Sequence, residues 1–398
     1  MILSTSTPQL SKIGSSLVGS AAVDAKRQAD KLAESGKTII DLGFGEPDGD
    51  APEIVKQATI AALGNGESHY VDPSGLGELR ESIAAYERRR HKVPFRAEGV
   101  VVTSGTFGAL TLAFRALLDP GDEALVLEPF WGPYAGMIRL CGAVPIAVQA
   151  QQTERGMLSP DLAALEAKIS AKTRLVVINS PNNPSGYVWS KAELEQLGKL
   201  CVERNLWIVS DEVYAALVFG GVQHHSISGL SPEIAERTIV VSSMSKAFAM
   251  TGWRLGYTIS TPQTAQVLAR INHYTVRCAT SFVQRGAIAA FENEPFLLRE
   301  MIALYGARRD LVSRSLQRFP SLTHIPPDGT FYAFVRLPDH LDDSEFVSRL
   351  LSEEGVIMGA GSRYGPSAKG FVRLSFAAAD DQIEAGLDRF GKLVERLT

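Results

Sequence analysis

The chain has 398 residues, enough for two or three domains, and its 45% hydrophobic and 21% charged residues are an ordinary globular composition. No apolar run approaches the roughly 20 residues of a membrane-spanning helix. Lys and Arg number 40 against 44 Asp and Glu, and this net charge of −4 without a basic block argues against a nucleic-acid partner. The cysteines are too widely spaced for a disulfide framework, and the N-terminal residues lack the pattern of a signal peptide. We therefore expect a cytoplasmic protein without a membrane partner.

From residue 100 onward, short apolar runs alternate with amphipathic stretches of helical length. Six of these runs are predicted to be strands: 100–103, 123–127, 174–178, 206–209, 238–241 and 255–259. Helices are expected over 107–118, 159–171 and 191–204, and the last begins with a capping box formed by Ser190 and Glu193. Strands that alternate with helices need crossover connections. The pattern therefore predicts an α/β fold, with a mostly parallel sheet and helices on both faces.

The pattern changes after about residue 285. A long helical segment over about 285–319 leads to two strand-like stretches, 329–335 and 371–376, and then to a terminal helix at 380–397. Such an order is typical of a smaller α+β domain. We expect a large domain at 46–285 and a small domain formed by 1–45 together with 286–398.

An isolated lysine follows the predicted strand at 238–241. Lys246 is flanked by small hydroxyl residues, and no other charge follows it until Arg254. An amine in such a setting tends to lose its water, which lowers its pKa and makes it a nucleophile able to form a Schiff base. Ser243 and Arg254 have a spacing that would allow them to hold an anion beside it.

Polar residues also follow three other predicted strands. Asp211 follows one of them, the segment 180–186 (Ser-Pro-Asn-Asn-Pro-Ser-Gly) follows another, and Ser104, Gly105 and Thr106 open a helix after a third. Ligands of parallel α/β sheets bind at the carboxyl ends of the strands. The sequence therefore predicts that these residues form one pocket with Lys246.

Together with the stretches 41–48 and 371–376, these motifs resemble, in order, the class I/II aminotransferases, which are pyridoxal 5′-phosphate (PLP) enzymes of fold type I. The resemblance runs from about residue 38 to residue 376 and so covers most of the chain. It implies a large domain built on a seven-stranded sheet, PLP as the cofactor, and a homodimer with shared active sites.

The resemblance also implies a role for each matching residue. Lys246 matches the lysine that holds the cofactor as an internal aldimine and then moves a proton. Asp211 matches the carboxylate that faces the pyridine nitrogen, and Tyr214 matches the donor to the ring oxygen. Other matches to cofactor-binding residues are Ser104, Gly105, Thr106, Trp131, Asn183, Ser243, Arg254 and, from the second subunit, Tyr70. Matches to residues that bind the substrate carboxylate are Gly45, Asn183 and Arg373.

Arg373 is also notable for its surroundings in the sequence. It is the only charged residue between Lys369 and Asp380, and it lies in an apolar strand-like stretch. A buried guanidinium without a partner is costly, so an anionic ligand is the natural partner. A structural salt bridge is the alternative.

The substrate side chain is left open by the sequence. Phe107 stands where many relatives carry a polar residue, and no second arginine for a distal carboxylate can be placed. His273, Tyr274 and Arg277 lie in a segment that in this family usually reaches the neighbouring active site. A dicarboxylate or otherwise polar substrate is compatible with that segment. The aromatic side chains that would equally suit an apolar or aromatic substrate are Phe44, Trp131 and Phe331.

The implied reaction is a ping-pong transfer of the amino group of an L-amino acid to a 2-oxo acid, and it has two rivals. PLP enzymes with the same motifs also carry out β-elimination, oxidation or cyclisation of amino acids. A non-catalytic regulator of this fold would carry a DNA-binding domain, and the forty or so residues before Gly43 are too few and too weakly basic for one. A metal site is not expected, because His224 and His225 lack a third ligand at a suitable spacing and are interpreted as a solvated loop.

Overall fold

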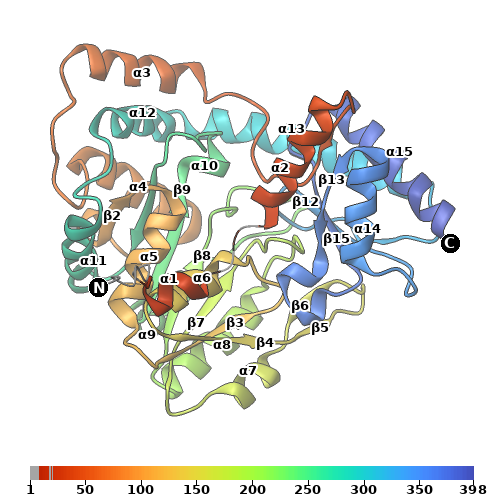
Figure 1. Ribbon diagram of the computed structural model, residues 1–398. Coiled ribbons are helices and arrows are strands. Elements are labelled where there is room, and N and C mark those ends of the chain that lie inside the picture. Colours follow the sequence, from red (N-terminus) through yellow and green to blue (C-terminus); the bar gives the residue numbers. More distant parts are fainter. Residues whose placement is uncertain (1–8, 18, 20) are drawn as a thin grey trace, which may run out of the picture.

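The computed structural model describes residues 9–17, 19 and 21–398, and Figure 1 shows a wide sheet with helices around it, beside a second group of strands and helices. Seven strands form the large sheet in the order β2-β10-β9-β8-β7-β3-β4. Their bounds are β2 Val100–Thr103, β3 Glu123–Leu127, β4 Val144–Val148, β7 Thr173–Asn179, β8 Trp207–Asp211, β9 Thr238–Ser243 and β10 Gly256–Ile259. All are parallel except β10, which runs antiparallel to β2 and β9. The predicted α/β class with a mostly parallel seven-stranded sheet is confirmed.

Helices cover both faces of this sheet because its strands carry apolar side chains on both faces. The helices are α3 Glu53–Gly64, α4 Gly77–His91, α5 Gly105–Leu117, α6 Pro133–Leu140, α7 Leu162–Lys168, α8 Lys191–Glu203, α9 Pro232–Ala235, α10 Met244–Ala247, α11 Pro262–Thr275 and α12 Ser281–Glu292. On β7, Val177 packs in a cluster with residues of α5 and α6, whereas Val176 packs in a cluster with residues of α8. Such two-sided burial is typical of parallel strands.

The six strands predicted from apolar runs all lie in the large sheet, and the prediction misses only β4. This strand lies at the edge of the sheet, where Val144 is 45% exposed and Pro145 interrupts the run.

The capping box at the start of α8 is confirmed. The Ser190 hydroxyl accepts the Glu193 N–H at 3.3 Å, and the Glu193 carboxylate accepts the Ser190 N–H at 2.7 Å.

The helix predicted over 159–171 is wrong at its start. Residues Leu158–Pro160 form β6, which pairs antiparallel with β5, Ala150–Gln152. The helix α7 begins only after Asp161, whose side chain accepts the N–H of Ala164 at 2.9 Å. A side chain that caps the first turn fixes the boundary there.

The single helix predicted over 285–319 is also wrong, because two helices occupy this region. The first is α12, and the second is α13, Glu294–Leu316. Asn293 separates them, and a proline lies in the first turn of α13. Proline is tolerated at a helix start but interrupts a helix interior, so one continuous helix is excluded.

The second sheet has the strand order β11-β12-β15-β14. Its strands are β11 Thr323–His324, β12 Tyr332–Arg336, β14 Gly359–Ala360 and β15 Phe371–Ser375. The elements near it are α2 Ala21–Glu34, β1 Ile40–Asp41, α14 Asp343–Arg349, β13 Val356–Ile357 and α15 Asp380–Leu397, whereas α1 Lys12–Ser16 contacts α6 beside the large sheet (Figure 1). β1 pairs in parallel with β13, which joins residues near the N-terminus to the C-terminal part of the chain. The predicted strand at 371–376 and the terminal helix are confirmed, whereas the strand predicted from 329 begins at Tyr332.

A shared core joins the two sheets beside the end of β8. Tyr214 and Leu217, which follow β8, pack in the same cluster as Tyr332, the first residue of β12, and Phe331 just before it. The carboxyl end of β8 therefore lies against the second sheet. Within the described part of the chain, no helix is both long enough and apolar enough to cross a membrane.

Candidate active site

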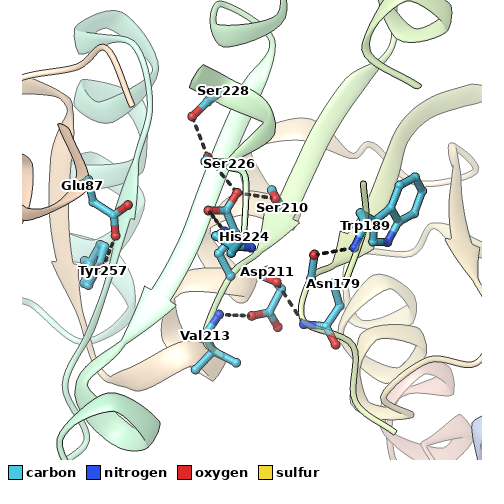
Figure 2. Close-up of polar contacts among 12 residues, drawn as sticks. Glu87, Asn179, Trp189, Ser210, Asp211, Val213, His224, Ser226, Ser228 and Tyr257 are labelled. Atoms are coloured by element: carbon cyan, nitrogen blue, oxygen red, sulfur yellow. Dashed lines mark hydrogen bonds and ion pairs between the residues drawn. The ribbon is translucent and has the colours of Figure 1, made fainter. Parts of the chain in front are cut away.

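Four strands of the large sheet end in polar residues at one edge. Thr103 ends β2, Asn179 ends β7, Asp211 ends β8 and Ser243 ends β9. Asn179 and Asp211 are register partners, and the Asn179 side-chain amide donates to the Asp211 carbonyl at 2.9 Å (Figure 2). The strand ends at which ligands bind in such sheets are thus lined with polar groups.

Lys246 lies in α10, a single helical turn that begins directly after β9. The Ser243 hydroxyl caps this turn by accepting a main-chain N–H at 3.3 Å. The Lys246 amine donates to the Gly45 carbonyl, and Nζ lies 5.6 Å from the ring centroid of Phe331. Burial is the main cause that lowers the pKa of Lys246 to about 8, and the positive charge of Arg373 contributes. A fraction of this amine is therefore neutral and nucleophilic near neutral pH.

Asp211 is 2% exposed and keeps its carboxylate in a small hydrogen-bonded site. The Tyr134 hydroxyl donates to Oδ2 at 2.6 Å, and the Val213 N–H donates to Oδ1 at 3.2 Å. Burial raises the pKa of Asp211 to about 6, whereas the Tyr134 hydrogen bond and the Lys246 charge oppose this rise. A buried carboxylate of this kind gains free energy when a cation faces it.

Tyr214 is buried between the end of β8 and the second sheet. Its hydroxyl lies 3.0 Å from the hydroxyl of Tyr332, and burial raises the pKa of Tyr214 well above its usual value. Tyr214 is therefore a neutral hydrogen-bonding group at neutral pH. The Tyr332 hydroxyl also packs against Gly45, where a Cβ atom would overlap it, so that this position needs glycine.

The start of α5 meets a guanidinium at Gly105. Ser104 precedes the helix, and Gly105 has a φ of +74°. A Cβ atom on Gly105 would overlap the guanidinium of Arg254, which itself donates to the Thr251 carbonyl at 2.7 Å. Only glycine lets the main-chain N–H groups of the α5 N-terminus and this guanidinium lie so close. Together with the partly exposed Thr106, they form a cradle suited to an anion such as a phosphate.

Arg373 is buried beside this cluster and has only neutral partners. Its guanidinium donates to Asn183 Oδ1 at 3.1 Å and to the Gly43 carbonyl, and it lies 4.4 Å from the ring centroid of Tyr332. Its Nε is buried and has no hydrogen-bond partner among the described residues, nor does any described carboxylate form an ion pair with Arg373. The structural salt bridge considered for this residue thus finds no support, and the guanidinium keeps its capacity to bind an anion.

The comparisons with known proteins agree with this geometry. A family profile described as aminotransferase class I and II matches residues 37–390. The chain belongs to the class I and II aminotransferases. An aspartate aminotransferase of Thermotoga maritima is 38% identical over 92% of this chain and 94% of that protein. An aromatic-amino-acid aminotransferase of Thermococcus litoralis is 35% identical, again over 92% of this chain and 94% of that protein.

Solved structures place this aminotransferase in fold type I. A double mutant of Thermus thermophilus aspartate aminotransferase superposes with a TM-score of 0.91 at 34% identity, covering 97% of this chain and 100% of that one. The chain is thus an enzyme, a transaminase.

Three aromatic residues of this aminotransferase form a row beside Asp211, and one of them, Trp131, was predicted to bind the cofactor. Trp131 lies in the loop before α6, and its ring centroid is 5.4 Å from that of Tyr134, the partner of Asp211. Phe107, in the first turn of α5, lies 4.9 Å from Trp131 in an edge-to-face arrangement and is 47% exposed. Phe107 therefore presents an apolar surface next to Trp131.

Tyr70 lies apart from this cluster within the single chain. It is 79% exposed, and the Arg277 guanidinium lies 5.2 Å from its ring centroid. Arg277 also contacts the His273 ring, with 2.9 Å between Nη1 and Nδ1, and the neighbouring Tyr274 is 87% exposed. The residues predicted to reach a second active site thus form one exposed group on the surface of this aminotransferase.

The prediction of a solvated histidine pair is wrong for His224. This side chain is buried, and its Nε2 lies 3.2 Å from Glu212 Oε2 (Figure 2). His225 is partly buried. Among the residues that the structure describes, no group of three or more His, Cys, Asp or Glu side chains is arranged to hold a metal ion.

Three residues of the site escape the sequence analysis. Asn179 ends a strand and could have been found by the rule that led to Asp211. Tyr134 gives no such signal, because it lies 77 positions from the carboxylate to which it donates. Tyr332 was included only as part of a strand, although its ring packs on Arg373 and its hydroxyl contacts Tyr214.

Proposed function

We propose that this aminotransferase binds PLP through Lys246 and exchanges the amino group of an L-amino acid for the oxygen of a 2-oxo acid in a ping-pong cycle. The observation that carries the proposal is that a partly buried, partly neutral amine and a buried acid occupy the same edge of the sheet. Lys246 has its pKa lowered to about 8, Asp211 has its pKa raised to about 6, and both lie at the same edge of the sheet.

The residues present fit this cofactor. The cradle of Gly105 and Arg254, which a Cβ atom would fill, suits the phosphate, and Ser243 adds a hydroxyl nearby. We propose that Asp211 faces the pyridine nitrogen, that Tyr214 donates to the ring oxygen and that Trp131 stacks on the ring. When bound, PLP supplies an aldehyde that captures amines and a cationic ring that withdraws electrons from the substrate Cα.

The chain itself supplies the binding and the proton transfer. Arg373 and Asn183 would bind the substrate carboxylate, and the Gly45 main chain lies within reach of the Lys246 amine. A fixed carboxylate orients the substrate so that its Cα–H bond is the one broken. Lys246 Nζ is neutral in part at physiological pH. It would take the proton from Cα of the amino acid in the first half of the cycle and give a proton to Cα of the new amino acid in the second half.

The side chain of the preferred substrate is proposed to be aromatic or large and apolar. Phe107 exposes an apolar surface beside Trp131, and it directly follows Thr106 of the cofactor cradle. One relative named above is an aromatic-amino-acid aminotransferase, whereas another acts on aspartate by its name. A panel of amino acids offered to the PLP-loaded protein decides the point, and a clear preference for aspartate would refute this choice.

A second copy of the chain is proposed to complete the active site, in a cytoplasmic homodimer. Tyr70 is 79% exposed in the single chain and is proposed to reach the phosphate of the partner subunit. Mixed dimers test this arrangement. If Lys246→Ala and Tyr70→Phe variants are combined, about a quarter of the sites in a random mixture gain both intact residues, and activity recovers above that of either variant alone.

We also propose that the chain has two domains, a large one at 46–285 and a small one formed by 1–45 together with 286–398.

The reaction type is tested by the half-reaction. The holoprotein, mixed with one amino acid and no acceptor, should yield one 2-oxo acid and one pyridoxamine phosphate per site. Release of ammonia or peroxide in place of these products would favour elimination or oxidation. The Lys246→Ala variant should lose the half-reaction, and turnover by that variant at a comparable rate would refute the mechanism.

A further inference from the structure

A buried polar cluster lies directly behind the residues proposed to hold the cofactor. Glu212 follows Asp211 in the chain and is 2% exposed. Its Oε1 accepts hydrogen bonds from Ser210 Oγ at 2.7 Å and Ser226 Oγ at 2.9 Å, and its Oε2 lies 3.2 Å from His224 Nε2 (Figure 2). Three polar side chains thus surround this buried carboxyl group.

A second carboxyl group, that of Glu87 on α4, lies near Glu212 but has almost no partners. It is 3% exposed, and its Oε1 accepts the Tyr257 hydroxyl at 2.5 Å. Its Oε2 is buried without any hydrogen-bond partner among the described residues. The side chains of Glu87, Glu212 and Tyr257 line one small cavity, together with Ser242 and residues of α10.

The charged groups around Glu87 would not neutralise the carboxylates of both Glu87 and Glu212 if both were ionised. Arg90, on the same helix, is paired with Glu294 at 2.5 Å, and Arg89 binds the same carboxylate at 2.9 Å, so that these two arginines face three carboxyl groups, those of Glu294, Glu87 and Glu212. Tyr86 and Tyr257 are kept neutral by burial, which raises the pKa of both, and burial lowers the pKa of His91 well below its usual value. The remaining facing group is Glu212 with its His224 partner, the latter 5.0 Å from the His91 ring. Two ionised carboxylates in this site would repel each other without a compensating cation.

We propose that Glu87 and Glu212 form a buried acid pair with a single negative charge, in which Glu87 holds the proton and Glu212 stays ionised to anchor the Asp211–Tyr214 turn. Glu212 is the positioning residue, because its bonds to Ser210 and Ser226 fix the main chain between the acid and the tyrosine of the proposed site. Glu87 acts through it by remaining neutral. When Glu87 ionises, repulsion across the cavity displaces Glu212 and with it this turn.

The titration of Glu87 has a defined direction. Burial, and next the negative charge of Glu212, raises the pKa of Glu87 to about 8 from the 4.5 of an unperturbed glutamate. Between these two values the native state holds a proton that the unfolded state releases. The stabilising effect of this proton is complete below the unfolded pKa and is lost as the pH rises through the native pKa.

Denaturation of the apoprotein at several pH values tests the acid pair without any cofactor. The variant Glu87→Gln keeps the acceptor for Tyr257 but cannot ionise, so every other titration cancels in a ratio to the wild type. The unfolding constant of the wild type relative to this variant should rise about tenfold per pH unit between about pH 4.5 and about pH 8, and stay constant below and above this range. A ratio that does not change with pH would overturn the proposal.

Two further variants keep the test decisive. Glu81→Gln changes an exposed glutamate on the same helix, and its ratio to the wild type should be independent of pH over this range. Glu212→Gln removes the repelling charge, so that its unfolding constant should stop rising at a lower pH than that of the wild type. If Glu87→Gln fails to fold, an unchanged position of this plateau in Glu212→Gln would refute the pair.

The positioning role rests on the proposed PLP site and has its own readout. The affinity of the wild type for PLP should weaken above about pH 8 relative to Glu87→Gln, whereas Glu81→Gln should follow the wild type. If the apoprotein ratio behaves as expected but PLP affinity shows no such difference, the acid pair stands and its action on the turn is refuted. If neither protein binds PLP, the proposed function fails while the apoprotein test remains valid.

Discussion

The hydrogen bond between Tyr134 and Asp211 gives the sharpest prediction about the electrostatics of the site. The Tyr134 hydroxyl donates to Asp211 Oδ2 at 2.6 Å, inside a region where both side chains are buried. The substitution Tyr134→Phe removes this donor and leaves the aromatic ring beside Trp131. Because the bond favours the ionised carboxylate, its loss should raise the pKa of Asp211 further.

The size of the effect follows from two numbers. Burial raises the pKa of Asp211 from 3.8 to about 6, which corresponds to about 3 kcal/mol of native-state stability that is present below the unfolded pKa and lost as the pH rises through 6. A hydrogen bond to a charged group is worth about 1.5–3 kcal/mol, so its loss should raise the pKa by a further one to two units. The stability difference between wild type and variant should therefore widen by about 1.5–3 kcal/mol as the pH rises from about 5 to about 8.

Urea denaturation of the apoproteins across this pH range measures the difference. Tyr187→Phe is the matched control, because Tyr187 also donates to a carboxylate, Glu193, at 2.6 Å, but at the capping box of α8 rather than at the site. Its stability difference from the wild type should change much less with pH. A Tyr134→Phe difference that stayed constant from about pH 5 to about pH 8 would refute the assignment of Asp211 as a buried acid tuned by this tyrosine.

Three further substitutions probe the cradle, the core and the substrate site. Gly105→Ala, at a φ of +74°, should cost about 1–2 kcal/mol in strain and weaken PLP binding about tenfold or more. The control Gly121→Ala, at a φ of +92° with open space around it, should leave PLP affinity unchanged. Equal PLP affinities of the two variants would contradict the cradle. Arg308→Met removes two hydrogen bonds of 2.7 Å to Asp48 and one of 3.0 Å to Asp380. It should lower the free energy of unfolding by about 2–3 kcal/mol in urea, and no loss would show that these bonds are dispensable. Arg373→Lys loses the fork that suits a carboxylate and should raise KM for both substrates about tenfold or more; an unchanged KM would remove Arg373 from the substrate site.

The large sheet could be predicted from the sequence because its strands are buried on both faces and therefore appear as local apolar runs. The prediction fails where burial is partial, as at the edge strand β4, whose Val144 is 45% exposed. It also fails where a single residue sets a boundary. Asp161 starts α7 by capping it, and Asn293 separates two helices that periodicity alone had merged.

The candidate site could be predicted as far as strand ends reveal it. Asp211 and Lys246 lie at or just after the carboxyl ends of buried strands. Ligands of parallel sheets bind at these ends, so the positions could be predicted from the sequence. Their surroundings could not be predicted, because they depend on contacts between distant segments. Tyr134 lies 77 positions from Asp211, and Glu87 lies 170 positions from Tyr257. The same reason explains the error at His224, which contacts Glu212 and the ring of His91, both distant from its glycine-rich neighbours in the sequence.

The central claim is that the Lys246 amine forms the covalent link to PLP. The direct measurement is reduction of the PLP-loaded protein with borohydride, followed by proteolysis and mass spectrometry of the peptides. We predict one pyridoxyl group per chain, attached to Lys246 and absent when this residue is replaced by alanine. A label on a different lysine, or a protein that carries none after saturation with PLP, would contradict the account.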